Sequence, residues 1–325
     1  MTASTALVHL AAGVGNIVLA TPLLVALYEL GLSVHILLDA DYEETVELLR
    51  PWGVVQSVRN GSEWSSAPAC DVAVPAVPPF YWPRFRREYR AARMVTRPPD
   101  RAFYENEQRY YLEFARRLGY TRDDAPRCCL PIGARDDGIV TRDTVVLAPG
   151  CKTGEMTAKR WPYFSLLAER FDDVAVVGTP DDERRDGAAL KWPPHVRSFT
   201  GSLTLRETAE LMAGAGVVVA NDSGLAHVAA AVGTATLMLF GPTPHVTLGD
   251  FPSNVRVMRR GLACEPCWFG ARLSACQGRV DCLHGLDLGS VEEATRSLLG
   301  GSSTGAQAGD VASLPELRLS ASRLA

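Results

Sequence analysis

Residues 217–245 read VVVANDSGLAHVAAAVGTATLMLFGPTPH, and this stretch decides the fold. The apolar run 217–220 stops at the polar turn 221–224, an Ala-rich amphipathic segment covers 225–232, and a second apolar run follows at 235–240. This order predicts strand, turn, helix and strand. In an α/β domain such a turn lies at the carboxyl edge of the sheet, where the free N–H groups and positive end of the next helix favour an anion.

The turn carries an unusual set of polar side chains. Asp222 would repel a phosphate bound there, so we interpret it as a group that holds sugar hydroxyls. An ordinary strand-turn-helix supplies glycine and an occasional Ser or Asp, but rarely the whole block Asp222, Ser223, Gly224 and His227. For His227 a second interpretation stays open, that of a core histidine on the buried face of the helix.

The block NDSGLAH, followed by AAAVGTATLMLFGPTPH, resembles the signature of the bacterial heptosyltransferases, glycosyltransferase family 9. In that signature a [ND]-D-[ST]-G-x-x-H turn precedes a strand that ends in F/Y-G-P-T. The resemblance extends over nearly the whole chain to about residue 299. It implies the α/β fold class GT-B, with two Rossmann-like domains facing across a cleft. We therefore expect an acceptor-binding domain over 1–138, a nucleotide-sugar-binding domain over 139–299 and a disordered Gly/Ser/Ala-rich tail over 300–325.

Length and composition agree with this organisation. A chain of 325 residues suits two domains, and 47% hydrophobic with 22% charged residues describes a soluble globular protein. No run approaches the ~20 apolar residues of a membrane span, and the first residues lack the basic region of a secretory signal, so we expect a cytoplasmic protein. A net charge of −4 gives no reason to expect nucleic acid as a partner. Peripheral contact with a membrane stays open.

The N-terminal half begins with a strand, a glycine turn and a helix. The apolar run 6–11 ends at Ala12-Gly13-Val14-Gly15-Asn16, and 17–30 has helical periodicity, so Asn16 is expected as the N-cap. A strand at 33–38, a helix at 42–49 and a short strand at 53–55 follow, an order that favours a doubly wound parallel sheet.

The same turn resembles the family's G-[IMV]-G-D motif, whose aspartate is taken as the general base that deprotonates the acceptor hydroxyl. This chain has Asn16 at that position. An amide can orient a hydroxyl but cannot take its proton near pH 7. Three explanations stay open: a base that has moved, with His9, Asp39 and Asp41 as nearby candidates; slow transfer by positioning alone; or a non-catalytic sugar-nucleotide-binding protein.

The acceptor would be met by Gly15, Asn16 and an arginine-rich stretch that begins after Phe80-Tyr81-Trp82. Arg84 and Arg87, with Arg86 and Arg90, would contact sugars or phosphates, since aromatic faces stack on pyranose rings and arginine binds anions bidentately. The alternative is a solvated helical face. The neutral residues just before the glycine turn argue against a strongly anionic acceptor, so both the lipopolysaccharide inner core and a natural-product scaffold are kept.

The second half opens after a polar linker at 134–142 with a strand at 144–147. Lys159-Arg160-Trp161-Pro162 resembles the family's K-[RH]-W-P, whose lysine meets the diphosphate of the donor; a surface Lys-Arg pair beside a core Trp is the alternative. Pro162 is expected to start a helix. Acidic residues after the strand 174–177 would hold the ribose, a role shared between Asp181 and Asp182.

The resemblance implies a metal-independent, inverting transfer from a nucleotide sugar, ADP-heptose by family inference. Thr157 and Lys159 would hold the diphosphate together with the backbone of Ser223, Gly224 and Leu225. Asp222 would grip the heptose, and His227 would support the turn or a phosphate. The predicted catalytic residues are Asn16, at the base position, Asp222 and Lys159.

Four of the eight cysteines are spaced C-x₂-C-x₈-C-x₅-C, at Cys264, Cys267, Cys276 and Cys282. Four thiolates from short loops suit a tetrahedral structural zinc or iron ion. Many family members have a similar C-x-P-C block, and a related group of protein heptosyltransferases has a four-cysteine iron site. Free or buried thiols are the other interpretation, and catalysis requires no cofactor in either case.

Overall fold

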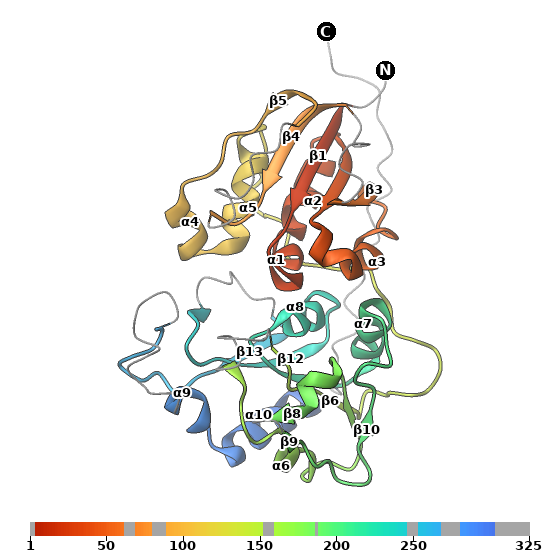
Figure 1. Cartoon of the computed structure of the whole chain (residues 1–325), viewed down its shortest axis with the longest axis vertical. Coiled ribbons are helices and arrows are strands. Elements are labelled where there is room, and N and C mark those ends of the chain that lie inside the picture. The colour runs from red at the N-terminus through yellow and green to blue at the C-terminus, as the bar shows by residue number, and fades with distance from the viewer. Residues whose placement is uncertain are drawn as a thin grey trace.

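The structure, a computed structural model, contains two parallel sheets, one from each half of the chain (Figure 1). It describes residues 4–61, 69–79, 89–151, 159–185, 188–245, 253–267 and 280–302. Within this part of the chain, none of the helices has the length and apolar character needed to cross a membrane.

The N-terminal sheet has the strand order β3-β2-β1-β4-β5, with every neighbouring pair parallel. Its strands are β1 (Thr5–Leu10), β2 (Ser33–Leu38), β3 (Val55–Asn60), β4 (Cys70–Ala76) and β5 (Ala91–Met94). Its helices are α1 (Val14–Leu19), α2 (Thr21–Glu29), the 3₁₀ turn η1 (Ala40–Thr45), α3 (Val46–Leu49), α4 (Asp100–Glu105) and α5 (Glu107–Arg116). The order confirms the doubly wound sheet that the sequence predicts.

The start of α1 corrects one expectation. Gly13, with φ +148°, is the N-cap, and Asn16 lies inside the first turn, where its carbonyl accepts from Ala20 N at 3.1 Å. Glycine adopts this φ without steric cost, so the helix starts three residues earlier than the N-cap preference of asparagine predicts. The helix expected over 17–30 is also divided, because Pro22 lies in the first turn of a second helix, α2.

The C-terminal sheet has the order β10-β7-β6-β11-β12-β13, again all parallel. Its strands are β6 (Val145–Ala148), β7 (Val174–Val176), β10 (Arg197–Ser198), β11 (Val217–Asn221), β12 (Ala235–Leu239) and β13 (Val255–Met258). Its helices are α6 (Phe164–Ala168), the 3₁₀ turn η5 (Pro180–Glu183), α7 (Leu205–Gly214), α8 (Gly224–Ala231), α9 (Asp281–His284) and α10 (Leu288–Ser302), and a small hairpin pairs β8 (Arg184–Arg185) with β9 (Ala188–Ala189). The first of these helices begins at Phe164 after the N-cap Tyr163, so Pro162 precedes the helix instead of starting it.

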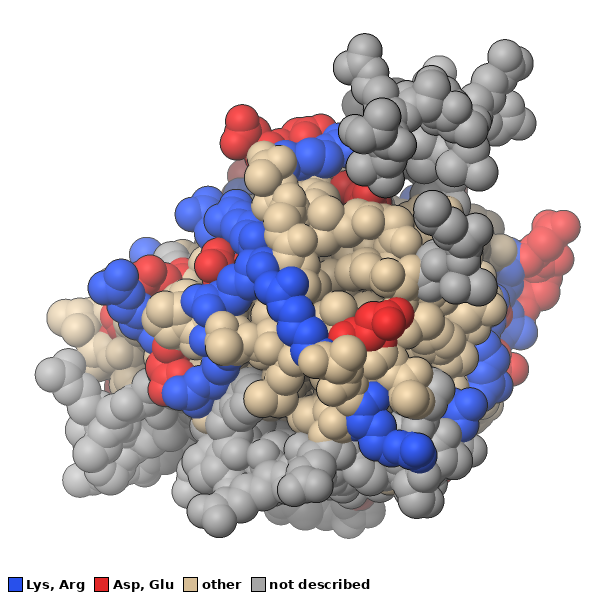
Figure 2. Space-filling view, turned by 90° about the horizontal axis from the view of Figure 1, so that it is seen from above, with Lys and Arg blue, Asp and Glu red and all other residues tan. Residues whose placement is uncertain are grey.

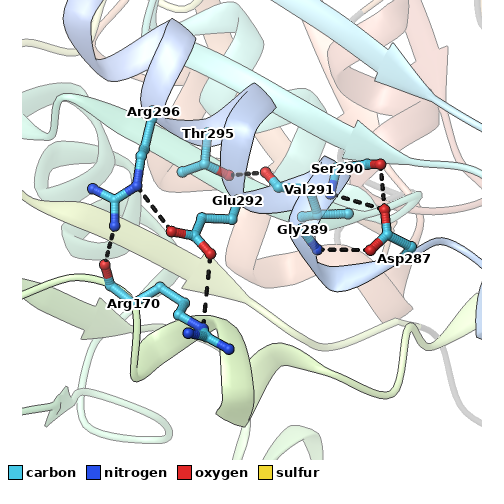
Figure 3. Close-up of polar contacts among 8 residues, drawn as sticks. All are labelled: Arg170, Asp287, Gly289, Ser290, Val291, Glu292, Thr295 and Arg296. Carbon is cyan, nitrogen blue, oxygen red and sulfur yellow. Dashed lines mark hydrogen bonds and ion pairs between the residues drawn. The ribbon is translucent and has the colours of Figure 1, made fainter.

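The terminal helix α10 is fastened at both its start and its middle (Figure 3). Asp287 accepts hydrogen bonds from the backbone N–H groups of Gly289 and Ser290, each at 2.9 Å, which satisfies two of the free donors at the helix start. Further along, Arg296 pairs with Glu292 and donates to the Arg170 carbonyl at 2.5 Å, which ties α10 to the segment after α6.

The two sheets meet through α1 and α8, which pack against each other between the halves (Figure 1). Glycines allow this close approach: a Cβ at Gly224 would lie 2.9 Å from Val14 Cβ, and one at Gly15 would lie 3.0 Å from the His227 ring. The apolar core is continuous across the contact, since one cluster of buried side chains includes Ile17 of α1 and Ala226 of α8. The polar turns at the carboxyl ends of β1 and β11 therefore face a common region.

Candidate functional site

A buried cluster of polar side chains surrounds Asp222, which follows the last residue of β11. Lys159 Nζ lies 2.9 Å from Asp222 Oδ2, and the Thr243 hydroxyl donates to the same oxygen at 2.6 Å. His227 Nε2 lies 3.9 Å from Oδ1. The side chains of Lys159 and Asp222 are 11% and 7% exposed, so this ion pair is largely withdrawn from solvent.

The charge state of Asp222 follows from this surrounding. Burial alone would raise its pKa, but the Lys159 ammonium, the His227 ring and the Thr243 hydroxyl outweigh burial and hold the pKa of Asp222 below its ordinary value. Asp222 is therefore an anion throughout the physiological pH range. A fixed negative charge at this place can orient sugar hydroxyls and hold the lysine over the turn.

Asn221 holds the segment that follows Lys159 against the sheet edge. Its side chain accepts a hydrogen bond from Trp161 N at 2.9 Å and donates one to the Pro149 carbonyl at 2.6 Å, which joins the segment around Lys159 to the ends of β6 and β11. Trp161 is buried and donates through Nε1 to the Leu286 carbonyl at 2.9 Å. Lys159 therefore lies at the sheet edge and is not a surface lysine. The alternative interpretation, a surface Lys-Arg pair beside a core tryptophan, is right only for Trp161, which is a core residue.

The start of α8 has two features that favour an anion, backbone N–H groups without a side-chain cap and the positive end of the helix. Ser223 is the N-cap, but its side chain makes no capping hydrogen bond to the helix, so the first N–H groups lack an acceptor from the cap. Its buried Oγ has no hydrogen-bond partner within the part of the chain that the structure describes. The turn also lies where strand order reverses between β6 and β11, the position at which doubly wound sheets bind ligands.

The two acidic residues expected at the ribose differ in their surroundings. Asp182 pairs with Arg160 Nη2 at 3.0 Å and accepts from the backbone and hydroxyl of Thr179, and its carboxyl group lies against Gly150 after β6. Asp181 is exposed. The contacts of Asp182 hold the loop in place, and its ribose role stays a prediction. Thr157, expected at the diphosphate, lies outside the described residues.

On the N-terminal side, Asn16 is hydrogen-bonded to a buried carboxylate that the sequence analysis missed. Asn16 Nδ2 donates to Glu107 Oε1 at 2.5 Å, and the Tyr111 hydroxyl donates to the same oxygen at 3.0 Å. Glu107 is 3% exposed and is the first residue of α5. Burial raises the pKa of Glu107 to about 7, despite the hydrogen bonds from Asn16 and Tyr111, and the charge of Asp222 adds to the increase.

Of the three bases proposed near Asn16, His9 is fully buried on β1, with Nδ1 2.9 Å from the Tyr89 hydroxyl. Asp39 follows β2, and the side chain of Asp41 lies outside the described part. Glu107 stands 91 positions from Asn16 in an arginine-rich stretch, and no local sequence signal marks it as a partner.

The arginine-rich stretch is described only from residue 89 onward, and Arg84, Arg86 and Arg87 lie outside the described residues. Seen from above, basic side chains form a row across the molecule with acidic ones beside them (Figure 2). Several described arginines make surface contacts within the chain: Arg93 with the Arg117 carbonyl, Arg97 with Asp100, Arg117 with Thr96, and Arg122 with Glu29 and Asp124. These contacts favour the solvated-face interpretation for this part.

The cysteine motif is described in part. Cys264 is exposed, whereas Cys267 and Cys282 are buried, and Cys276 lies outside the described residues. Burial raises the pKa of the Cys282 thiol to about 12. Within the described ranges, the structure has no group of three or more His, Cys, Asp or Glu side chains able to hold a metal ion. The four-cysteine site thus stays a prediction.

Two doubly wound sheets that face each other through α1 and α8, with polar turns at the carboxyl ends of β1 and β11, define the GT-B class. Solved structures share this fold. The glycosyltransferase family 9 protein of Veillonella parvula has a TM-score of 0.69 at 15% identity, covering 92% of this chain and 98% of that one. The E. coli ADP-heptose lps heptosyltransferase II has a TM-score of 0.63 at 18% identity, with coverage of 91% and 99%.

Residues 81–272, more than half of the chain, match the family model described as glycosyltransferase family 9 (heptosyltransferase). The chain belongs to this family. Lipooligosaccharide heptosyltransferase 2 of Haemophilus influenzae is 34% identical in an alignment of 131 residues that covers 36% of this chain and 37% of that protein. The aligned segment thus spans little more than a third of the length of this curated relative.

Proposed function

We propose that this protein is an inverting glycosyltransferase that moves a heptose from ADP-heptose to a hydroxyl of a saccharide acceptor. One observation carries the proposal: Lys159 is held 2.9 Å from Asp222 at the uncapped start of α8. A diphosphate needs positive charge and free N–H donors, and this turn supplies both at the switch point of the sheet.

The donor is inferred from the relatives. The E. coli structure is named as an ADP-heptose lps heptosyltransferase, and the Haemophilus influenzae relative as a lipooligosaccharide heptosyltransferase. We place the diphosphate over the backbone N–H groups of Ser223, Gly224 and Leu225. Asp222, which stays ionised, would accept hydrogen bonds from heptose hydroxyls, and His227 would support the turn.

The leaving group is stabilised by the protein itself in this proposal. Negative charge grows on the diphosphate as the bond to the sugar breaks, and the Lys159 ammonium and the positive end of α8 lie where that charge develops. Lys159 is paired with Asp222 before the donor arrives, so its ammonium is already oriented. The side chain therefore loses little conformational entropy when it binds the phosphate.

The acceptor would enter from the α1 side of the α1–α8 contact, where Gly15 and Asn16 lie. The relatives' names point to a lipooligosaccharide or lipopolysaccharide acceptor. The neutral turn at Ala12 and Gly13 suits a less charged natural-product scaffold as well. Measuring ADP release with each kind of acceptor distinguishes the two.

The test is calorimetry followed by transfer. Wild type is titrated with ADP-heptose, with UDP-glucose as the control donor, and ADP release is then followed with heptose-free, O-deacylated lipopolysaccharide core as acceptor. We expect binding of ADP-heptose that weakens at least ~10-fold in Lys159→Ala, as expected for a charge-assisted contact to phosphate. No retention of ADP-heptose, or unchanged retention in Lys159→Ala, would contradict the assignment.

Asn16 at the base position favours one alternative, a sugar-nucleotide-binding protein without transfer activity. The same experiment separates the two. Retention of ADP-heptose without ADP release, with either the core acceptor or small glycosides, identifies a binder. Release that depends on the acceptor identifies a transferase.

A further inference from the structure

We propose that Glu107 is the group that takes the proton from the acceptor hydroxyl, and that Asn16 positions it. This inference rests on the proposed transferase function. It assigns the task of the missing aspartate to a carboxylate of another helix, α5. This carboxylate is hydrogen-bonded to Asn16, the residue at the position of the family's base.

The geometry supports this exchange of roles. Asn16 Nδ2 and the Tyr111 hydroxyl both donate to Oε1 of Glu107, at 2.5 Å and 3.0 Å. Oε2 receives no hydrogen bond from any residue in the described part of the chain. Two donors thus fix the carboxylate through one oxygen and leave the other to accept a proton.

The same contact explains why position 16 holds an amide. An aspartate there would place two carboxylates within hydrogen-bonding distance in a buried site, where like charges cannot both ionise. Asparagine instead donates a hydrogen bond to the buried anion. The departure from the family motif and the buried glutamate are therefore two parts of one arrangement.

The protonation behaviour of Glu107 suits a base. Its pKa of about 7 lies near neutral pH, where general bases are most effective. In the described part of the chain, the groups that face it are Tyr111 on its own helix, the neutral Asn16 on α1, Asp222 from the turn after β11, and the thiol of Cys128. Of these, Asp222 is the charged group at neutral pH, and it raises the pKa of Glu107.

The step balances without a further reactant. The acceptor O–H bond breaks as its oxygen bonds to the anomeric carbon, and the proton passes to Oε2 of Glu107. The bond between the anomeric carbon and the phosphate oxygen breaks, and its electron pair leaves with ADP. Glu107 then releases the proton to water.

A charge-swap experiment tests the assignment. Glu107→Gln keeps the shape of the side chain and removes the base, and we expect transfer from ADP-heptose to the lipopolysaccharide core to fall ~10²–10⁴-fold, with the ADP-heptose Kd within about 2-fold of wild type. The double variant Asn16→Asp with Glu107→Gln reverses the pair, so the amide donates to a carboxylate at position 16. We expect this variant to recover at least ~10-fold over Glu107→Gln, because a base has been restored.

The pH profile of kcat/KM separates catalysis from a structural role. Wild type should lose activity on the acid side with a pKa near 7, and the charge-swapped variant should show this limb at lower pH, because Asp ordinarily titrates near ~4. The variant Tyr111→Phe removes the other donor to Oε1 and should move the acid limb upward, since that hydrogen bond lowers the pKa of Glu107.

Two results would overturn the proposal: Glu107→Gln within a few-fold of wild type, or a loss of transfer in Glu107→Gln that the swap does not recover. Thermal melting of each variant identifies a failure to fold. If the variants at position 107 do not fold, the pH profile of Tyr111→Phe decides, and an acid limb at the wild-type position overturns the proposal. If wild type transfers heptose from ADP-heptose but these variants behave otherwise than expected, only Glu107 is misassigned. If wild type retains no ADP-heptose, or retains it without releasing ADP, the proposed transferase function fails and the role of Glu107 fails with it.

Discussion

Replacing Lys159 by methionine should destabilise the C-terminal sheet by about 3 kcal/mol. Removing one partner of a buried ion pair costs roughly 3–5 kcal/mol, because the other charge is left buried without compensation. We expect the lower end of this range. The carboxylate of Asp222 keeps the Thr243 hydroxyl at 2.6 Å, and methionine retains most of the apolar stem of the lysine.

Amide hydrogen exchange, followed by mass spectrometry on peptides from β11 and β12, measures this loss without assuming that the whole chain unfolds in one step. A loss of 3 kcal/mol corresponds to protection that falls by about 100-fold or more. The matched control is Arg50→Met, which removes an exposed pair with Glu47, 60% and 52% exposed, and should cost less than about 0.5 kcal/mol.

A double variant isolates the cause. If the penalty comes from the unpaired carboxylate, Lys159→Met with Asp222→Asn should regain more than half of it, because the amide carries no charge to bury. The reasoning is refuted if Lys159→Met lowers protection no more than Arg50→Met does. It is also refuted if the double variant is as unstable as Lys159→Met alone.

Three further outcomes are expected. The stability of wild type relative to Glu107→Gln should fall by about 3 kcal/mol as pH rises from about 4.5 to about 7. The folded pKa of about 7 lies above the ordinary value of 4.5, so between these two values the folded state binds a proton that the unfolded state has lost, and this advantage disappears as pH passes the folded pKa. Urea unfolding across this range checks it, and a constant difference would contradict it. Gly224→Ala should cost ~1–3 kcal/mol and loosen the α1–α8 contact, since its Cβ would lie 2.9 Å from Val14 Cβ. Its melting temperature should fall well below that of Gly53→Ala, whose Cβ would meet nothing within 4 Å, and equal values would disprove the clash. EDTA should leave the rate of ADP release within about 2-fold, and loss of activity restored by a divalent cation would show that Lys159 and α8 do not suffice.

The fold could be predicted from the sequence because its signals are local. The apolar runs that became β1, β2, β6, β7, β11 and β12 are short, bounded by turn residues and separated by helical segments, and this alternation leaves few topologies open. Thr204 and Glu207 form a capping box at the start of α7, a contact between residues three apart. Errors arose where two local preferences competed, as at Asn16, where Gly13 starts the helix first.

The sequence predicted which residues come together only in the C-terminal half, where the family motifs contain them. The block from Asn221 to His227 and the segment at Lys159 come together as the resemblance implies, 63 positions apart for Lys159 and Asp222. The hydrogen bond between Asn16 and Glu107 joins residues 91 positions apart, and neither residue type requires the other. Such a pair depends on how α5 packs against α1, which periodicity does not determine.

The pKa values of the two buried carboxyl groups of the site, Asp222 and Glu107, are shifted in opposite directions. Lys159 keeps Asp222 ionised, whereas Glu107 has neutral donors and a pKa near 7. Two nearby carboxyl groups whose pKa values are separated in this way suit two different tasks, a permanent anion and a proton acceptor. The separation also depends on the contact between them, because the charge of Asp222 raises the pKa of Glu107. In the proposed mechanism, the α1–α8 packing, made close by Gly15 and Gly224, would thus link donor binding on one half to base strength on the other.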